Sequence, residues 1–335
     1  MSRANSGALW LVVVVLVAVV AANADLLSRR FRRHIEPRLA EPFPQGAELH
    51  ALASIVTLTS LPVPFALWVL NGPDQISRDL REYGRFASAE TALFAHILSG
   101  SDCVNTTTGE RRLVVDVGAN LGYFCNMAAS YGCEVVCVEP NPLLARLVAT
   151  SLQANRFSHH AVVVAAALGS HGNRHALLAT DPSFLGLARI TEVTSPGSPL
   201  ARDRSAGLPA DIGTAALQRT STQVPLMRFA DIVAPGDALL IKIDTEGYEL
   251  DVFVGMEWWA AESGAAHWIV ELKVPREQKL AWLWQRCPAT GRMRSYREYY
   301  ETPPPAFLKT VADVTFLDLA QGATSSPHED VWLRC

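Results

Sequence analysis

The residues best suited to bind a ligand follow a short apolar run, Leu113–Val117. Asp116 stands near the end of this run, and a turn with two glycines, Gly118 and Gly122, comes directly after it. A buried strand that ends in polar residues and a tight turn delivers those groups to a ligand cleft. Glycine has no Cβ, so a ligand can approach the backbone closely there. The G-x-x-x-G spacing differs from the G-x-G-x-x-G pattern of dinucleotide-binding turns and disfavours that class of site.

Glu139 is a second candidate for ligand binding. It follows another apolar run, Glu134–Val138, and lies 23 residues after Asp116. That separation is close to the one at which a ribose-binding acid follows a glycine-rich turn. A carboxylate here can accept hydrogen bonds from both ribose hydroxyls. An acid that merely favours the dipole of the next helix is the structural alternative. Together with the first turn, the pattern favours ribose binding.

Six short motifs follow one another along the chain. They are Asp116–Gly122 (DVGANLG), Val138–Asn141 (VEPN), Ala166–Gly169 (AALG), Val224–Leu226 (VPL), Lys242–Glu249 (KIDTEGYE) and Ile269–Leu272 (IVEL). In this order they resemble the FkbM family of S-adenosylmethionine-dependent methyltransferases. The resemblance covers roughly Phe94 to Leu272, with weaker similarity back to Pro64.

The resemblance implies a fold, a cofactor and a reaction. The fold would be α/β, a class I methyltransferase (Rossmann-like) mostly parallel sheet with a reversed final strand and helices on both faces. The cofactor would be S-adenosyl-L-methionine, and the methyl group would pass to a hydroxyl oxygen of a sugar or small metabolite. We therefore expect an enzyme of class EC 2.1.1.-.

The resemblance also implies which residues would bind the cofactor. The first turn would wrap the methionine part, Glu139 would bind the ribose, and the Ala167–Leu168 turn would lie beside the adenine. The full expected set is Asp116, Gly118, Asn120, Gly122, Tyr123, Phe124, Glu139, Pro140, Asn141, Ala167 and Leu168.

Lys242, Asp244 and Glu246 are the candidates for catalysis. They alternate along the chain, so in an extended segment they would share one face, with Asp244 at its tip. Methyl transfer to an alcohol is an in-line displacement by a weak nucleophile, which benefits from a nearby base and tight positioning. We expect Asp244 to be the base or substrate orienter and Glu246 the second candidate, with Lys242 paired to one of them. Alternatively, Glu246 or Glu249 stabilises the start of the next helix, and Lys242 is structural.

A divalent cation is a further option for these acids. Asp244 and Glu246 could both be ligands, as in methyltransferases that require a metal ion. Two carboxylates without a third placed ligand do not define such a site. We therefore predict no metal.

Alternating strand and helix patterns surround the motifs and predict a right-handed parallel α/β sheet. Asn141 is a good N-cap with Pro142 in the first helical position, which predicts that a helix begins there. The expected strands are Pro64–Leu70, Leu113–Val117, Glu134–Val138, Ala161–Leu168, Ala238–Ile243, His267–Leu272, Asp313–Leu319 and Asp330–Leu333. The last two would form an antiparallel end of the sheet.

The chain divides into several segments. At 335 residues it can fill one large core or a core with a modest extension. We expect an N-terminal cap at 48–110 and an FkbM-like methyltransferase domain at 111–335. Within the domain, 194–222 is rich in Pro and Gly and predicts a flexible insertion. Specificity for the acceptor is expected in the region 181–222 and in the cap.

The N-terminus predicts a membrane-targeting segment. Ala8–Ala22 is an unbroken apolar run of 15 residues, shorter than a spanning helix requires, and Ala22-Asn23-Ala24 has the form of a signal-peptidase site. We expect a signal peptide or signal-anchor at 1–24 and a basic, Pro-rich stalk at 25–47. The chain would then be membrane-associated in the secretory pathway (ER or Golgi). Arginines after the apolar run leave the side of the membrane open, including a reversed anchor with a cytoplasmic domain.

Composition restricts the partners. Lys plus Arg number 29 against 33 Asp plus Glu, which gives a net charge of -4 and no electrostatic footprint for nucleic acid. We expect a small-molecule or glycan hydroxyl acceptor, and the oligomeric state stays open. The six cysteines include no CxxC pair, which argues against a zinc ribbon or thioredoxin motif. Cys133 and Cys137 are expected in the core, and no disulfide pairing can be deduced. The sequon at Asn105 matters only in a lumenal domain.

Two other functions are compatible with this fold class. One is a noncatalytic, membrane-tethered scaffold, which the presence of Asp116, Glu139 and Asp244 disfavours. The other is an NAD-dependent oxidoreductase, which the spacing of the first glycine turn disfavours.

Overall fold

The computed structural model describes residues 39–44, 46–99, 103–104, 109–172, 174–181, 184–193, 220–271, 278–279, 282–283, 292–296 and 330–334. Several predictions fall outside these residues: the targeting segment at 1–24, the stalk at 25–38, the sequon at Asn105, residues 194–219 of the insertion, the strand Asp313–Leu319, and two cysteines, Cys287 and Cys335. In the part of the chain that is described, no helix has both the length and the apolar character to cross a membrane.

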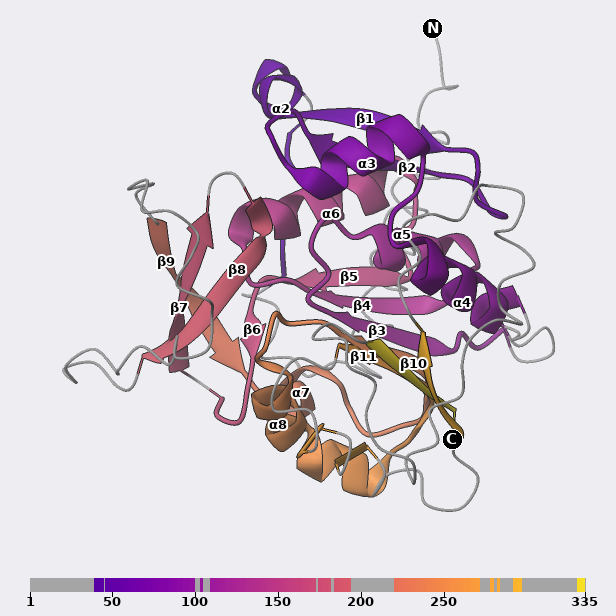
Figure 1. Ribbon diagram of the computed structural model, residues 1–335, viewed down its shortest axis with the longest axis vertical. Coiled ribbons are helices and arrows are strands. Elements are labelled where there is room, and N and C mark those ends of the chain that lie inside the picture. The colour runs from indigo at the N-terminus through magenta and orange to yellow at the C-terminus, as the bar shows by residue number, and fades with distance from the viewer. Residues whose placement is uncertain are drawn as a thin grey trace, which may run out of the picture.

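A seven-stranded sheet forms the centre of the molecule, in the order β12-β13-β11-β10-β3-β4-β5 (Figure 1). Its strands are β3 (Leu113–Val117), β4 (Glu134–Val138), β5 (Ala161–Val164), β10 (Ala238–Ile243), β11 (Ala265–Glu271), β12 (Arg292–Tyr296) and β13 (Asp330–Arg334). The five strands from β11 to β5 are parallel, whereas β13 runs antiparallel to β11. The predicted parallel sheet with a reversed final strand is confirmed.

Helices cover both faces of this sheet, as predicted. One face packs against α4 (Ser88–Ser99), α5 (Tyr123–Ser130) and α6 (Pro142–Ala154), and the other against α7 (Phe229–Ile232) and α8 (Glu249–Glu262) (Figure 1). Alternate strand residues point to opposite faces. Val114 and Leu240 therefore belong to the core under α5 and α6, while Val115 and Ile241 belong to the core under α8.

The start of α6 follows the predicted capping chemistry. Asn141 Oδ1 accepts hydrogen bonds from the backbone N–H groups of Leu143 and Leu144, at 3.0 and 3.5 Å. Pro142 occupies the first turn, where it has no donor to leave unsatisfied. These bonds fix the helix directly after the end of β4 and after Glu139.

The N-terminal cap packs on helices. It comprises α2 (Ala47–Leu52), β1 (Ala53–Leu58), β2 (Phe65–Leu70) and α3 (Gln75–Tyr83). The strands β1 and β2 pair as a separate two-stranded sheet. The N–H groups of Ala66 and Trp68 donate to Asn155 Oδ1 and Ser151 Oγ, at 2.8 and 2.9 Å. Side chains from the α6 end of the domain thus satisfy the open edge of β2, and the cap covers α5 and α6.

A second sheet, in the order β6-β9-β7-β8, branches from the first. It contains β6 (Ala167–Leu168), β7 (Arg174–Asp181), β8 (Phe184–Val193) and β9 (Thr220–Met227). The predicted single strand Ala161–Leu168 is wrong, because β5 ends at Val164 and β6 pairs with β9. Both halves are buried, so the apolar run gives no sign of the break. The end of the predicted insertion is also wrong, since residues 220–222 belong to β9.

Candidate functional site

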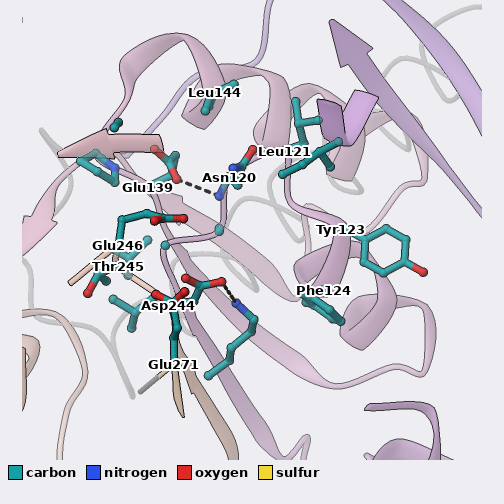
Figure 2. Close-up of a pocket in the computed structure, with 18 of the residues that line it drawn as sticks. Asn120, Leu121, Tyr123, Phe124, Glu139, Leu144, Asp244, Thr245, Glu246 and Glu271 are labelled. Atoms are coloured by element: carbon teal, nitrogen blue, oxygen red, sulfur yellow. Dashed lines mark hydrogen bonds and ion pairs between the residues drawn. The ribbon is translucent and has the colours of Figure 1, made fainter. Parts of the chain in front are cut away.

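A cavity of about 400 Å³ lies at the carboxyl ends of the parallel strands (Figure 2). Its floor is formed by the loops that follow β3, β4, β5 and β10, by β6 and by the end of β11. Open α/β sheets bind their ligands at this edge. Most of the predicted site residues line the cavity: Gly118, Asn120, Tyr123, Phe124, Glu139, Pro140, Ala167, Leu168, Lys242, Asp244 and Glu246.

The two principal motifs interlock at Gly118. This residue has a φ of 82°, and a Cβ there would collide with the backbone oxygen of Asp244. The Asp244 N–H donates to the Val117 carbonyl at 3.0 Å. Gly122, with a φ of 78°, faces the side chain of Val148 in α6 in the same way. Gly118 therefore both lines the cavity and makes room for the Asp244 backbone, whereas Gly122 does not line the cavity and makes room for Val148.

Glu139 ties two loops together at the floor of the cavity. Its Oε2 accepts a hydrogen bond from the Asn120 N–H at 2.8 Å (Figure 2). Its Oε1 accepts one from the Asn141 N–H, also at 2.8 Å. Burial raises the pKa of Glu139 to about 7, although the two amide donors favour the charged form. Each carboxylate oxygen keeps a second lone pair that a ribose hydroxyl can use. Asn141 itself caps α6 and does not line the cavity.

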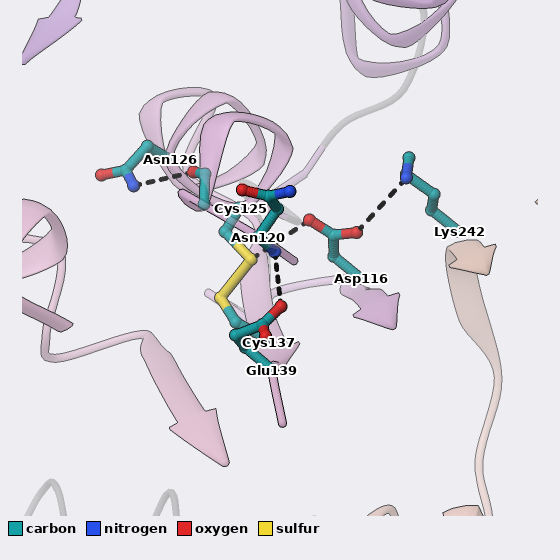
Figure 3. Close-up of a disulfide and its surroundings, with 8 residues drawn as sticks. Asp116, Asn120, Cys125, Asn126, Cys137, Glu139 and Lys242 are labelled. Atoms are coloured by element: carbon teal, nitrogen blue, oxygen red, sulfur yellow. Dashed lines mark hydrogen bonds and ion pairs between the residues drawn. A yellow bond between two sulfur atoms is a disulfide. The ribbon is translucent and has the colours of Figure 1, made fainter. Parts of the chain in front are cut away.

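Asp116 lies behind the cavity wall, not on its surface. Its exposed fraction is 1 %, and its Oδ1 is 4.0 Å from Lys242 Nζ. Its Oδ2 is 3.3 Å from the Sγ of Cys125, which forms a disulfide with Cys137 (Figure 3). Burial raises the pKa of Asp116 to about 6, and Lys242 opposes that shift. The predicted direct contact of Asp116 with a cofactor is not what this geometry gives.

Lys242 is a buried ammonium among three carboxylates. Its Nζ lies 3.1 Å from Asp244 Oδ2, 3.8 Å from Glu90 Oε1 and 4.0 Å from Asp116 Oδ1. The predicted pairing of Lys242 with one of the motif acids is confirmed, and that acid is Asp244. The Asp244 side chain is 37 % exposed, whereas those of Glu90 and Asp116 are buried. Asp244 therefore presents the charge of this cluster to the cavity.

Glu90 is a site residue that the sequence did not reveal. It lies in α4, among apolar residues of a helix that sequence analysis assigned only to the cap. A buried acid in an otherwise apolar helix is a usable signal, because such an acid requires a counter-charge. Here Lys242 supplies it.

Two further carboxylates lie beside Asp244. Ligand oxygens of Asp244, Glu246 and Glu271 all lie within 4.8 Å of one another, a grouping that could hold a divalent cation. Sequence analysis did not assign Glu271 to the site, although it stands near the end of the predicted strand His267–Leu272; the pairing of β11 with β10 brings the two strand ends together. Glu246 has a φ of 57°, a left-handed conformation that is unusual for a residue with a side chain.

The upper walls of the cavity come from outside the floor loops. The start of α3 contributes Gln75 and Ile76, the segment before α4 contributes Phe86, and β8 contributes Ala188 and Ile190. Tyr123 packs edge-on against Phe86, with ring centroids 6.2 Å apart. The cap and the second sheet therefore enclose the cavity from two sides.

Comparison with known protein families assigns the chain to one of them. The model of the methyltransferase FkbM domain matches residues 116–299. The chain belongs to this family. It is an S-adenosylmethionine-dependent methyltransferase, of class EC 2.1.1.-. No curated protein matches the chain.

Solved structures give weaker likenesses. A precorrin-6y C5,15-methyltransferase from Geobacter metallireducens is 9 % identical with a TM-score of 0.33, covering 73 % of this chain and 88 % of its own. A 16S rRNA N2 G1207 methyltransferase from T. thermophilus is 12 % identical with a TM-score of 0.38, covering 87 % and 52 %. An O-methyltransferase from Thermotoga maritima is 11 % identical with a TM-score of 0.33, covering 80 % and 73 %. These values support no inference about activity or substrate.

The FkbM match divides the cavity into two parts. The floor loops and the carboxylates of Asp244 and Glu271 lie inside the matched segment 116–299, whereas Gln75, Phe86 and Glu90 lie before it. The floor therefore belongs to the family, and one wall belongs to the segment from α3 to α4 that precedes the match.

The floor fits S-adenosylmethionine. Glu139 offers carboxylate oxygens next to the glycine turn, and Leu121, Leu144 and Leu168 form an apolar surface beside it. Such a surface suits a planar base, and the carboxylate suits the ribose that the base carries.

Proposed function

We propose that this FkbM methyltransferase methylates a hydroxyl oxygen of a neutral, hydroxyl-rich small molecule or glycan. The charge of the cavity carries the proposal. Its carboxylates are Asp74, Glu90, Glu139, Asp244, Glu246 and Glu271. Among the described lining residues, Lys242 is the one basic side chain, and its Nζ lies within 4 Å of two of these acids.

This charge selects among acceptors. Ionised carboxylates accept hydrogen bonds and donate none, so they match hydroxyl groups. They repel phosphate and carboxylate groups, and a cavity with low-dielectric walls strengthens that repulsion. Apolar residues such as Phe86 and Ile190 offer surface for the nonpolar faces of such a molecule.

We assign cofactor binding to the floor loops. Glu139, held by the N–H groups of Asn120 and Asn141, would accept the ribose hydroxyls. Leu144 and Leu168 would contact the base. When bound, the cofactor supplies a methyl group on a positively charged sulfur. The protein supplies position, exclusion of water and a proton acceptor.

Asp244 is the proposed proton acceptor for the hydroxyl. Lys242 donates to its Oδ2 at 3.1 Å, which fixes the side-chain rotamer. The Val117 carbonyl holds the Asp244 backbone N–H at 3.0 Å. A fixed oxygen close to the hydroxyl aligns the nucleophile and takes its proton during transfer. Glu246 is the second candidate for this role.

The test uses the full chain and matched acceptors. Calorimetric titration with S-adenosylmethionine establishes cofactor binding first. Methyl transfer is then measured on neutral glycosides and on the corresponding uronic acids and phosphosugars, which keep the hydroxyl geometry and add charge. We expect neutral acceptors to have the higher kcat/KM, with a preference that shrinks as salt rises. Turnover confined to anionic acceptors, or transfer to nitrogen, would contradict the proposal.

A further inference from the structure

A buried ion pair lies directly behind the loop that carries Asp244. Glu249, the first residue of α8, and Lys279 are both fully buried, and Glu249 Oε2 lies 2.5 Å from Lys279 Nζ. Neither residue lines the cavity. Buried charges are expensive unless they are paired and hydrogen-bonded. The pair therefore calls for an explanation that direct contact with a ligand does not give.

The other oxygen of Glu249 holds the loop. Oε1 accepts hydrogen bonds from the Thr245 N–H at 3.0 Å, the Thr245 hydroxyl at 3.1 Å and the Gly247 N–H at 2.9 Å. These donors lie on both sides of Glu246. Sequence analysis offered Glu249 as an acid that favours the helix start. The structure shows its side chain turned back onto the residues before the helix.

The loop needs such support because its backbone is unfavourable. Glu246 has a φ of 57° and Gly247 a φ of 103°. A left-handed non-glycine residue persists only where the surrounding structure fixes it. The Glu249 carboxylate accepts hydrogen bonds from the N–H groups on either side of Glu246, and its ion pair with Lys279 holds that carboxylate in place.

We propose that Glu249 and Lys279 are positioning residues that hold Asp244 and Glu246 in their working geometry from behind the cavity. Lys279 acts through Glu249, and Glu249 acts through the amides of Thr245 and Gly247. This inference rests on the proposed role of Asp244 and adds residues that touch neither cofactor nor acceptor.

Two double variants of the full chain separate positioning from bulk stability. E249Q/K279M removes both charges and keeps a side-chain oxygen for the Thr245 and Gly247 amides. E249L/K279M also removes both charges and replaces that oxygen with methyl groups. Neither leaves a buried charge without a counter-ion, which is the severe defect of either single substitution.

The expected difference is in turnover and in amide protection. Displacement of a catalytic group by about 1 Å costs roughly 100-fold in rate, so E249L/K279M should lose about that much in kcat and E249Q/K279M far less. Affinity for S-adenosylmethionine should match wild type in both. Hydrogen exchange of the Thr245 and Gly247 amides should accelerate in E249L/K279M only. If both doubles show wild-type exchange and the same kcat, the proposal is wrong.

A conservative variant keeps the test decisive if the doubles do not fold. Glu249→Asp preserves the charge opposite Lys279 but withdraws the carboxylate by one methylene. We expect a folded protein with faster exchange at Thr245 and Gly247 and lower kcat, and unchanged exchange would overturn the proposal. Exchange does not depend on which acid is the base. If exchange at Thr245 and Gly247 is faster in Glu249→Asp while Asp244→Asn keeps full turnover, the positioning role of Glu249 stands and only the proposed role of Asp244 as base is rejected.

Discussion

Asp244 combines exposure with a fixed position, the two properties that a base for a hydroxyl requires. Its side chain is 37 % exposed, and Lys242 holds one of its oxygens. We expect Asp244→Asn to lower kcat by about 100-fold or more, because general-base catalysis contributes roughly that much. Affinity for S-adenosylmethionine should be unchanged, since the amide keeps the shape and the contact with the Lys242 ammonium. Single-turnover kinetics and calorimetry measure the two quantities, and an equal loss in both would place Asp244 in the cofactor site.

Glu139 predicts a pH-dependent stability. Burial raises its pKa from 4.5 to about 7, so between these values the folded protein holds a proton that the unfolded chain has released. The associated stability is full below pH 4.5 and is lost as the pH rises through about 7. We expect the free energy of unfolding of the cofactor-free protein to fall across this window. The free energy of unfolding, measured by urea denaturation at several pH values, should fall less steeply with pH in Glu139→Gln, because glutamine does not titrate.

Asp116 is the internal control for that measurement. Its pKa is raised to about 6, so its own contribution to the pH dependence remains in both proteins. Identical slopes for wild type and Glu139→Gln would mean that Glu139 does not titrate as its burial indicates.

At the scale of elements, the contact between the β3 and β10 loops depends on Gly118. Alanine there meets the Asp244 backbone oxygen and must also adopt a φ of 82°. We expect Gly118→Ala to cost about 2 kcal/mol or more of stability, because strain and displacement add. Gly72→Ala is the matched control, since a Cβ there meets nothing within 4 Å. Urea denaturation compares the two, and equal stabilities would show that the loops separate freely.

The strands that carry the site are the elements best predicted from sequence. The structure gives β3, β4 and β10 the predicted bounds, because strands buried on both faces read as apolar runs with clear ends. The break between β5 and β6 could not be predicted, since burial continues through it. A local apolar pattern predicts that a strand forms, but it does not predict which sheet the strand joins.

The contacts between elements could not be predicted from the sequence. Lys242, Asp244 and Glu139 were identified because each stands at the end of a predicted strand. Glu271 also stands near the end of a predicted strand but was not assigned to the site, and Glu90 lies in a helix; tertiary packing brings both carboxylates to the cavity. The sequence therefore identified most of the floor of the cavity and missed the acid that α4 contributes.

At the scale of the whole molecule, the disulfides bear on the compartment of the catalytic domain. Cys103 pairs with Cys133 and Cys125 with Cys137, with Cα separations of 4.5 and 6.0 Å. Sequence analysis expected Cys133 and Cys137 in the core, where both lie, and could not deduce the pairing. Disulfides persist in oxidising compartments and are rare in the cytosol.

This argument opposes the arginines that follow the apolar segment Ala8–Ala22. The positive-inside rule would keep the downstream domain in the cytoplasm, where glutathione would hold the four cysteines reduced. Charge near a segment biases orientation only, whereas a disulfide depends on the compartment that the folded domain occupies. We therefore propose a lumenal catalytic domain in the secretory pathway.

Protease protection tests the side of the membrane. In sealed vesicles that contain the full chain, we expect the domain to resist added protease until detergent opens the membrane. After alkylation, non-reducing electrophoresis should show bonded cysteines. Substitution of Arg29, Arg30, Arg32 and Arg33 by glutamine is the control for orientation, and it should leave protection unchanged if the domain is already lumenal. Digestion without detergent, together with free thiols, would place the domain in the cytoplasm, where a glycan acceptor of the secretory pathway would be out of its reach.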